Sequence, residues 1–175
     1  MQDKPEIRPG QSIELLKALH ILTRDGRLNQ DSRRKLKQVY HLYQFIEPLL
    51  QQIRQEQGSI RLVDCGAGKS YLGFILYDLF FKSLAPGSQV VGIESRHELV
   101  LKSRELASRL GFDAMSFLNL RVDEAISNTA GLGLSAGADI VTALHACDTA
   151  TDEAIRFALT AKARFIVLAP CCQAE

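Results

Sequence analysis

The hydrophobic and polar positions of the chain repeat with two different periods. After residue 57, short apolar runs alternate with longer stretches in which apolar residues recur every three or four positions. Short runs of this kind form buried strands, whereas the longer stretches form amphipathic helices. Strands that alternate with helices form a parallel sheet covered on both faces, so the chain is predicted to be an α/β protein. The pattern predicts strands over residues 60–64, 89–94, 115–119, 139–144 and 164–169 and helices over about 70–84, 96–110, 123–129 and 149–161.

The first 57 residues carry only the helical pattern. A helix is predicted over residues 11–23, with Ser12 as its N-cap. A longer helix is predicted over residues 31–57, in which Pro48 is expected to introduce a kink. We therefore divide the chain into a helical lead-in, residues 1–57, and an α/β domain, residues 58–175.

The loop after the first predicted strand carries the strongest functional signal. An apolar run ends at Asp64, and two glycines, Gly66 and Gly68, precede a long apolar segment. This order indicates a buried strand, a tight turn and a helix, with a turn backbone that a ligand can approach closely. A second apolar run ends at Glu94, thirty residues after Asp64. In a strand–helix–strand unit this acid lies at the carboxyl end of the neighbouring strand, where it can accept hydrogen bonds from both hydroxyls of a ribose.

Three classes of ligand bind at turns of this kind, and the spacing of the glycines distinguishes them. A phosphate-binding loop that includes Gly68 would need a glycine in place of Val63, and a dinucleotide fingerprint would need one in place of Tyr71. Asp64 at the mouth of the loop would also repel a pyrophosphate. S-adenosylmethionine carries an ammonium and a sulfonium but no phosphate, so it fits these residues better than a nucleotide does.

Together, Asp64, Gly66, Gly68 and Glu94 resemble the cofactor site of the class I S-adenosylmethionine-dependent methyltransferases. The resemblance covers residues 58–175 and implies a Rossmann-like, predominantly parallel sheet with the strand order 3-2-1-4-5. A complete sheet of this class has seven strands, and the pattern here supplies five. Because the fifth strand would otherwise be an exposed edge, we expect the chain to be truncated at its C-terminus and to contain the cofactor half of the domain.

Two later segments are similar to a particular branch of this class. Residues 145–148 contain a His-x-Cys pattern, and residues 170–172 read Pro-Cys-Cys. The branch with these segments includes the glutathione S-transferase C-terminal domain-containing proteins and their bacterial relatives. Ser70 departs from the class pattern, because many members have a third glycine there, but serine is also small.

The resemblance assigns the cofactor contacts to the carboxyl ends of the strands. Asp64 is expected to bind the methionine end, Glu94 the ribose and Ser95 the adenine. For the adenine amino group, the ambiguous register of the third strand leaves Asn119 and Asp123 as candidates; we prefer Asp123, which is equally suited to cap the next helix. The full set expected to contact the cofactor is Asp64, Gly66, Ala67, Gly68, Glu94, Ser95, Asn119, Asp123 and His145.

The candidates for catalysis follow the fourth and fifth strands, beside the expected position of the methyl group. They are His145, Cys147, Asp148, Cys171 and Cys172. His145 can act as a base near neutral pH or pack as an ordinary histidine. A cysteine nucleophile, as in RNA cytosine-C5 methyltransferases, would need an activated thiolate, and no Pro-Cys pair follows the fourth strand here. Buried structural cysteines are an alternative, and a metal or iron–sulfur site is disfavoured because the spacing fits none of the usual zinc patterns.

Composition and charge exclude several classes of protein. The chain has 175 residues, of which 46% are hydrophobic and 23% are charged, as in ordinary globular domains. The net charge of +1 gives no global field for binding nucleic acid. The longest apolar run is too short to span a membrane, and the N-terminus lacks a signal-peptide pattern. The four cysteines suit a reduced protein, so we expect a cytoplasmic location.

A basic run ahead of the α/β domain bears on the methyl acceptor. It consists of Arg24, Arg27, Arg33, Arg34, Lys35 and Lys37. Such a run can direct RNA towards a site, although it is often only the solvated face of a helix. We expect an RNA acceptor first and a protein acceptor second. The alternative function is a catalytically silent methyltransferase-like module that serves in binding or scaffolding.

Overall fold

The computed structural model describes residues 7–84, 86–129, 137–144 and 149–169. Its centre is one sheet of five parallel strands with the order β3-β2-β1-β4-β5, so the predicted α/β class and strand order are confirmed. Each strand lies within a residue of its predicted position. The strands are β1 (Arg61–Cys65), β2 (Gln89–Glu94), β3 (Met115–Asn119), β4 (Ile140–Leu144) and β5 (Phe165–Ala169).

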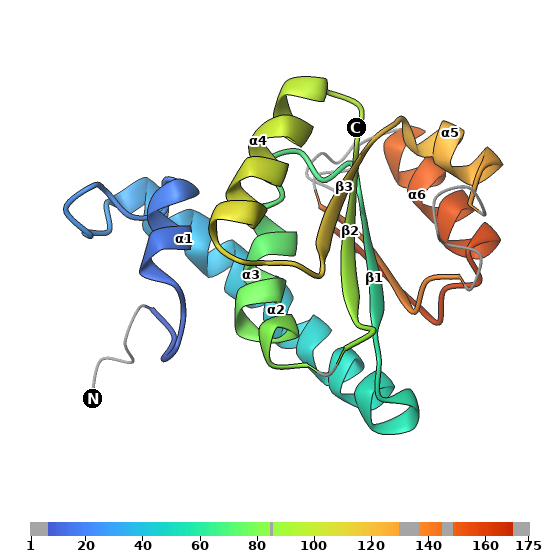
Figure 1. The fold of residues 1–175 in the computed structure, drawn as a ribbon, viewed down its shortest axis with the longest axis horizontal. Coiled ribbons are helices and arrows are strands. Elements are labelled where there is room, and N and C mark those ends of the chain that lie inside the picture. The colour runs from blue at the N-terminus through green and yellow to red at the C-terminus, as the bar shows by residue number, and fades with distance from the viewer. Residues whose placement is uncertain (1–6, 85, 130–136, 145–148, 170–175) are drawn as a thin grey trace, which may run out of the picture.

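Helices cover both faces of the sheet and give the domain three layers (Figure 1). Helices α2, α3 and α4 lie on one side of the strands, and α5 and α6 lie on the other. This is the arrangement that right-handed crossovers between parallel strands produce. The helical segments are α1 (Ile13–Ala18), α2 (Gln30–Gln57), α3 (Tyr71–Leu79), the short 3-10 helix η1 (Phe81–Ser83), α4 (His97–Arg109), α5 (Val122–Ser127) and α6 (Thr149–Thr160).

The sheet separates two apolar clusters, because neighbouring side chains of a strand point to opposite faces. Leu62 belongs to the cluster on the face of α2, α3 and α4, where Phe74 is fully buried. Val63 belongs to the cluster on the face of α5 and α6, where Phe157 is fully buried. Both faces of the central strand are therefore covered at Leu62 and Val63, as expected of a parallel sheet with helices on both sides.

Helix α2 is part of the main core. Its buried residues Tyr43, Ile46 and Leu50 lie in the same cluster as the sheet residues Leu62 and Val90. The helix runs without a break through Pro48. The segment that the sequence separates as a lead-in thus packs against the α/β domain over much of its length.

Helix α1 is shorter than predicted. The Ser12 side chain accepts a hydrogen bond from Leu15 N at 3.1 Å, as expected of the N-cap, but the helix ends at Ala18. His20 then adopts a left-handed conformation, with φ of 55°. The backbone N–H groups of Ile21 and Leu22 both donate to Leu16 O, which closes the end of the helix. An apolar pattern alone does not reveal this reversal.

Strand β5 is an edge strand, and its side chains are less buried than those of β1 and β2. Ile166 is 39% exposed.

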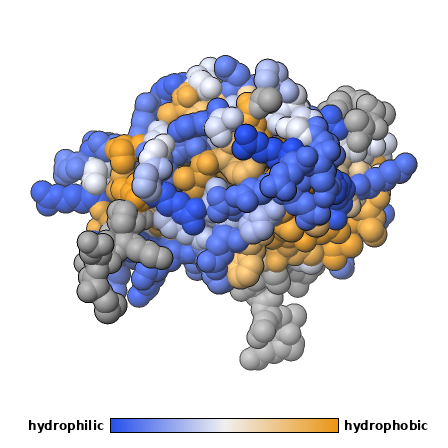
Figure 2. Space-filling model, turned by 90° about the horizontal axis from the view of Figure 1, so that it is seen from below, coloured by the Kyte–Doolittle hydropathy of each residue, from blue (hydrophilic) through white to orange (hydrophobic). Residues whose placement is uncertain are grey.

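Seen from below, the molecule has a hydrophobic region at the lower right, whereas polar and charged residues cover most of the rest of that face (Figure 2). None of the described helices is long and apolar enough to cross a membrane.

Candidate cofactor site

The loop between β1 and α3 is shaped by three residues in the left-handed region. Gly66 has φ of 65°, Gly68 has φ of 59° and Ser70 has φ of 52°. Glycine adopts this conformation without strain, which explains the two glycines at these positions. Ala67 N donates to Ile93 O at 2.9 Å and ties the loop to the end of β2. The turn therefore lies across the carboxyl ends of β1 and β2.

Gly92, inside strand β2, allows this close approach. It pairs with Asp64 across β1 and β2. A Cβ atom at Gly92 would lie 2.7 Å from Phe117 Cδ1 and 3.3 Å from the Cβ of Ala67. Because Gly92 has no side chain, Ala67 of the loop and the ring of Phe117 can both lie close to the backbone of β2. A glycine inside an apolar strand is the sequence signal for such an approach.

Asp64 is a buried carboxylate at the end of β1. It is 2% exposed, and Oδ1 accepts a hydrogen bond from Thr142 Oγ1 at 2.7 Å. Thr142 lies opposite Asp64 in the pairing of β1 with β4. Burial raises the pKa of Asp64 to about 7, although the Thr142 hydrogen bond lowers it. A cationic partner would offset the cost of burying the charged carboxylate, so this position suits an ammonium group.

Glu94 is held at the end of β2 by the loop and by Arg96. Its Oε2 accepts from Gly68 N at 2.7 Å, and its Oε1 accepts from Arg96 N at 2.9 Å. The Arg96 guanidinium adds bonds of 2.9 Å from Nε to Oε1 and 3.1 Å from Nη2 to Oε2. Burial raises the pKa of Glu94, but these donors outweigh it and hold the pKa below its usual range. Glu94 is therefore ionised at neutral pH.

A cleft of about 670 Å³ opens beside these groups. One wall is the loop with Asp64, Gly66, Ala67 and Gly68, and the opposite wall is the N-terminal half of α2. Glu94 is not a lining residue, but it accepts a hydrogen bond from Gly68 N in the loop wall, and Arg96 lines the cleft itself. The remaining lining residues are Lys35, Gln38, Val39, His41, Leu42, Lys69, Tyr71, Leu72, Leu144 and Ala169.

The three candidates for the adenine lie around the end of β3 and do not line this cleft. Asn119 pairs with Glu94 across β2 and β3, and its Nδ2 donates to Ser95 O at 2.8 Å and to Glu94 O at 3.2 Å. Asp123 lies in the first turn of α5, where Arg121 Nε is 3.0 Å from Oδ1. The structure therefore brings Asn119 and Ser95 next to Glu94, whereas Asp123 pairs with Arg121.

The five catalytic candidates, His145, Cys147, Asp148, Cys171 and Cys172, lie outside the described residues. Leu144 and Ala169, the last described residues before these segments, both line the cleft. The roles assigned to the five side chains remain sequence predictions.

Several residues of the site were not found from the sequence. Thr142 reads as an ordinary β-former in an apolar strand, and its contact with Asp64 follows only from the strand order. Arg96 follows Glu94 closely, which was a usable signal for a charged contact. The α2 residues Val39 and Leu42 belong to the apolar stripe of a helix that the sequence placed outside the domain.

The residues present fit S-adenosylmethionine. Asp64 is a buried carboxylate of the kind that can pair with an ammonium, and Glu94 is an ionised carboxylate of the kind that can accept from ribose hydroxyls. A Cβ atom at Gly66 would meet no atom within 4 Å, so space lies open over the turn. Val39 and Leu42 provide an apolar wall.

Comparison with known proteins identifies the family of this chain. A family model described as a methyltransferase domain matches residues 34–175. The glutathione S-transferase C-terminal domain-containing protein of Xenopus laevis is 30% identical over 111 residues, which cover 63% of this chain and 16% of that protein. The protein of the same description from Bos taurus is 25% identical over 150 residues, which cover 85% of this chain and 20% of that protein. The chain thus spans 16–20% of the length of these relatives.

Among solved structures, the crystal structure of monomeric WbdD shares the fold. Its TM-score is 0.53 at 19% sequence identity, and the match covers 74% of this chain and 30% of that chain.

Proposed function

The chain belongs to the family described as a methyltransferase domain, and from that premise we propose that it binds S-adenosylmethionine in the cleft and transfers its methyl group to an acceptor. The family membership confirms the predicted resemblance. The observation that carries the proposal is one cleft with Asp64 at its base and Glu94 bonded to its loop. The two carboxylates match the ammonium and the ribose of a cofactor that has no phosphate.

The residues around the cleft have separable roles. Asp64, oriented by Thr142, holds the ammonium, and Glu94 accepts from the ribose hydroxyls. Val39, Leu42 and the turn backbone exclude water from the reacting centre. When bound, S-adenosylmethionine supplies an electrophilic methyl group on a sulfonium. Because transfer is an in-line displacement, the main task of the protein is to position the acceptor.

We place RNA first as the acceptor and protein second. In support of RNA, the first turns of α2 carry a group of exposed basic residues, and one of them, Lys35, lines the cleft. The other members of the group are Arg33, Arg34 and Lys37. A cytoplasmic location is supported by Cys65, which is buried as a free thiol.

Calorimetry with S-adenosylhomocysteine tests the cofactor site. We expect the Glu94→Gln variant to bind at least tenfold more weakly, because a charge-assisted pair of hydrogen bonds to the ribose is worth about 1.5–3 kcal/mol. Glu98→Gln, an exposed acid in the first turn of α4, is the matched control and should bind as the wild type does. Arg96→Ala should bind at least as tightly, because Arg96 competes for the carboxylate of Glu94.

A folded wild-type protein that gives no heat and no thermal shift with S-adenosylhomocysteine would overturn the proposal. The acceptor is tested separately by transfer of a tritiated methyl group into total RNA and into total protein of a cell extract. Label in protein alone would replace RNA as the acceptor. Cofactor binding without label in either fraction would favour the scaffolding role.

A further inference from the structure

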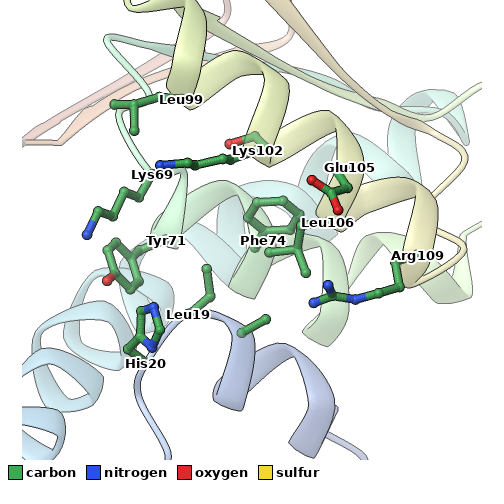
Figure 3. Close-up of a pocket in the computed structure, with 12 residues that line it drawn as sticks. Leu19, His20, Lys69, Tyr71, Phe74, Leu99, Lys102, Glu105, Leu106 and Arg109 are labelled. Atoms are coloured by element: carbon green, nitrogen blue, oxygen red, sulfur yellow. The ribbon is translucent and has the colours of Figure 1, made fainter.

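A second pocket, of about 310 Å³, lies next to the cofactor cleft. It is enclosed by the end of α1, the start of α3 and one face of α4 (Figure 3). Lys69 and Tyr71 line both this pocket and the cleft, so the two spaces meet at these residues. The pocket is at the small end of the range of ligand sites, about 300–1,000 Å³, and suits one compact group.

Helix α4 gives this pocket an alternating apolar and cationic wall. Leu99, Lys102, Leu106 and Arg109 recur every three or four positions and therefore share one face of the helix. The base of the pocket is apolar and includes Phe74, which is fully buried. An apolar base beneath cationic side chains suits a ligand that has both a flat apolar part and an anionic part.

Two of the cations are available to a ligand. Arg109 Nε lies 3.4 Å from Glu14 Oε1, and Glu105 also lines the pocket, so part of the local charge is neutralised. Lys69 and Lys102 are exposed, and among the described residues neither forms an ion pair. Two lysines without an ion pair among the described residues therefore line one pocket, and long lysine side chains can both reach a phosphate bound there.

Two aromatic rings line the pocket near Lys69. Tyr71 is partly exposed, and His20 is exposed. Figure 3 shows both rings on the same side of the pocket, with Lys69 beside Tyr71. The left-handed backbone of His20, with φ of 55°, is an unusual conformation that places the ring at the rim. Rings beside cations are the usual means of binding single-stranded nucleic acid, because every base has a face that can stack.

A basic path joins this pocket to the cleft. Lys35, at the start of α2, lines the cleft together with Lys69, and Lys69 lines the pocket together with Lys102. Lys35 is also 2.8 Å from Asp31, so its charge is partly offset. A polyanionic strand could therefore pass from the cleft over Lys69 and Tyr71 into the pocket.

We propose that this pocket binds one nucleotide of a single-stranded RNA acceptor, next to the nucleotide that enters the cleft. The base lies against Tyr71 and His20, and the phosphate lies between Lys69 and Lys102. The site anchors the strand and takes no part in the methyl transfer. This proposal rests on the proposed function only in that the neighbouring nucleotide is the one methylated in the cleft.

Fluorescence anisotropy with a labelled twelve-nucleotide single-stranded RNA, measured without cofactor, tests this site. We expect the double variant Lys69→Gln/Lys102→Gln to bind at least tenfold more weakly. Its slope of log affinity against log salt should fall by about 0.7, because the two lysines share one phosphate and each neutralised phosphate on a single strand contributes about 0.7. Tyr71→Leu should weaken binding about fivefold or more with an unchanged slope, because stacking is not salt-dependent in this way.

Arg156→Gln is the matched control, because Arg156 is exposed on α6, which covers the opposite face of the sheet. The proposal would be overturned if this control lost as much affinity as the double variant, or if the double variant bound RNA as tightly as the wild type does. It would also be overturned if the wild type did not bind RNA, or if poly-glutamate competed as well as RNA does. Calorimetry of Lys102→Gln with S-adenosylhomocysteine separates the two proposals, since Lys102 lies outside the cleft. Unchanged cofactor binding with weakened RNA binding is the expected result, whereas a wild type that binds RNA but no cofactor would overturn the proposed function alone.

Discussion

At the scale of single residues, the chemistry of the cleft depends on one buried acid. Asp64 is 2% exposed, and its hydrogen-bond donor is Thr142 on the neighbouring strand. Since a lone buried carboxylate is unstable in its charged form, Asp64 must either take up a proton or find a cation. The protonation state of Asp64 is therefore coupled to cofactor binding.

The link predicts a pH dependence of cofactor binding. Because burial raises the pKa of Asp64 to about 7, the free protein carries a largely protonated Asp64 at pH 6 and a largely ionised one at pH 8. The ammonium of S-adenosylhomocysteine binds the ionised form, so affinity should rise with pH up to about 7, nearly tenfold per pH unit below it. Calorimetry between pH 5.5 and 8 measures this change, and two buffers of different ionisation heat should report proton release.

Two variants separate Asp64 from the other titrating groups. Asp64→Asn should bind weakly at every pH and lose the steep dependence. Thr142→Val removes the hydrogen bond that lowers the pKa, so the rise in affinity should move to higher pH, whereas Thr142→Ser should behave as the wild type does. An affinity that stays flat between pH 5.5 and 8 in the wild type would contradict the assignment.

The contribution of Asp64 to the free energy of unfolding should change with pH in the opposite direction to cofactor affinity, and fall as the pH rises. The folded pKa of Asp64 is above its unfolded value of 3.8, so the folded state is favoured most below that value. This contribution is lost as the pH rises from about 4 to about 7.

The residues of the site differ in how far the sequence could predict them. Asp64 and Glu94 could be identified because each ends an apolar run, and such ends meet at one edge of a parallel sheet. Thr142 could not, since its role follows from the pairing of β1 with β4, strands that are far apart in the sequence. For Asn119 and Asp123 the register of β3 was needed, and the structure places Asn119 opposite Glu94.

At the scale of the elements, the strands could be predicted because they are short, apolar and closed by polar residues. Helix α1 could not be bounded, because its apolar pattern continues through Leu19, Ile21 and Leu22 after the helix has ended. These side chains are buried by the turn at His20 instead of by further helix. A periodic pattern reports burial, and burial does not require that the backbone stays helical.

The contact between β2 and the loop gives a prediction at this scale. Gly92→Ala should destabilise the fold by about 1–3 kcal/mol, the usual effect of overpacking a core. The added Cβ would lie 2.7 Å from Phe117 Cδ1, and this ring packs against Phe74 with ring centroids 5.6 Å apart. Urea unfolding followed by circular dichroism measures the change in free energy.

The Phe117 ring supplies the control for this prediction. In a Phe117→Leu background the ring is absent, so the further effect of Gly92→Ala should be smaller than in the wild type. Equal effects in the two backgrounds would show that the contact with Phe117 is not the cause.

At the scale of the whole molecule, α2 serves two purposes. Ile46 and Leu50 are fully buried in the main core, while Val39 and Leu42 face the cofactor cleft. A helix that both completes the core and closes the cleft makes folding and binding interdependent. The division predicted at residue 57 therefore marks a change in the sequence pattern. Unfolding experiments show whether the two parts also unfold separately.

The shared core predicts that the lead-in and the sheet unfold together. Ile46→Ala should lower the free energy of unfolding by about 2–4 kcal/mol, because it opens a cavity in a fully buried site. The chain has no tryptophan, so Phe45→Trp, at a position 58% exposed, gives a probe confined to α2. Its fluorescence and the circular dichroism of the whole chain should report the same midpoint in urea, with and without Ile46→Ala. A fluorescence transition that precedes the loss of the sheet would instead establish residues 1–57 as a separate unit, and the α2 wall of the cleft would then be free to open without unfolding the domain.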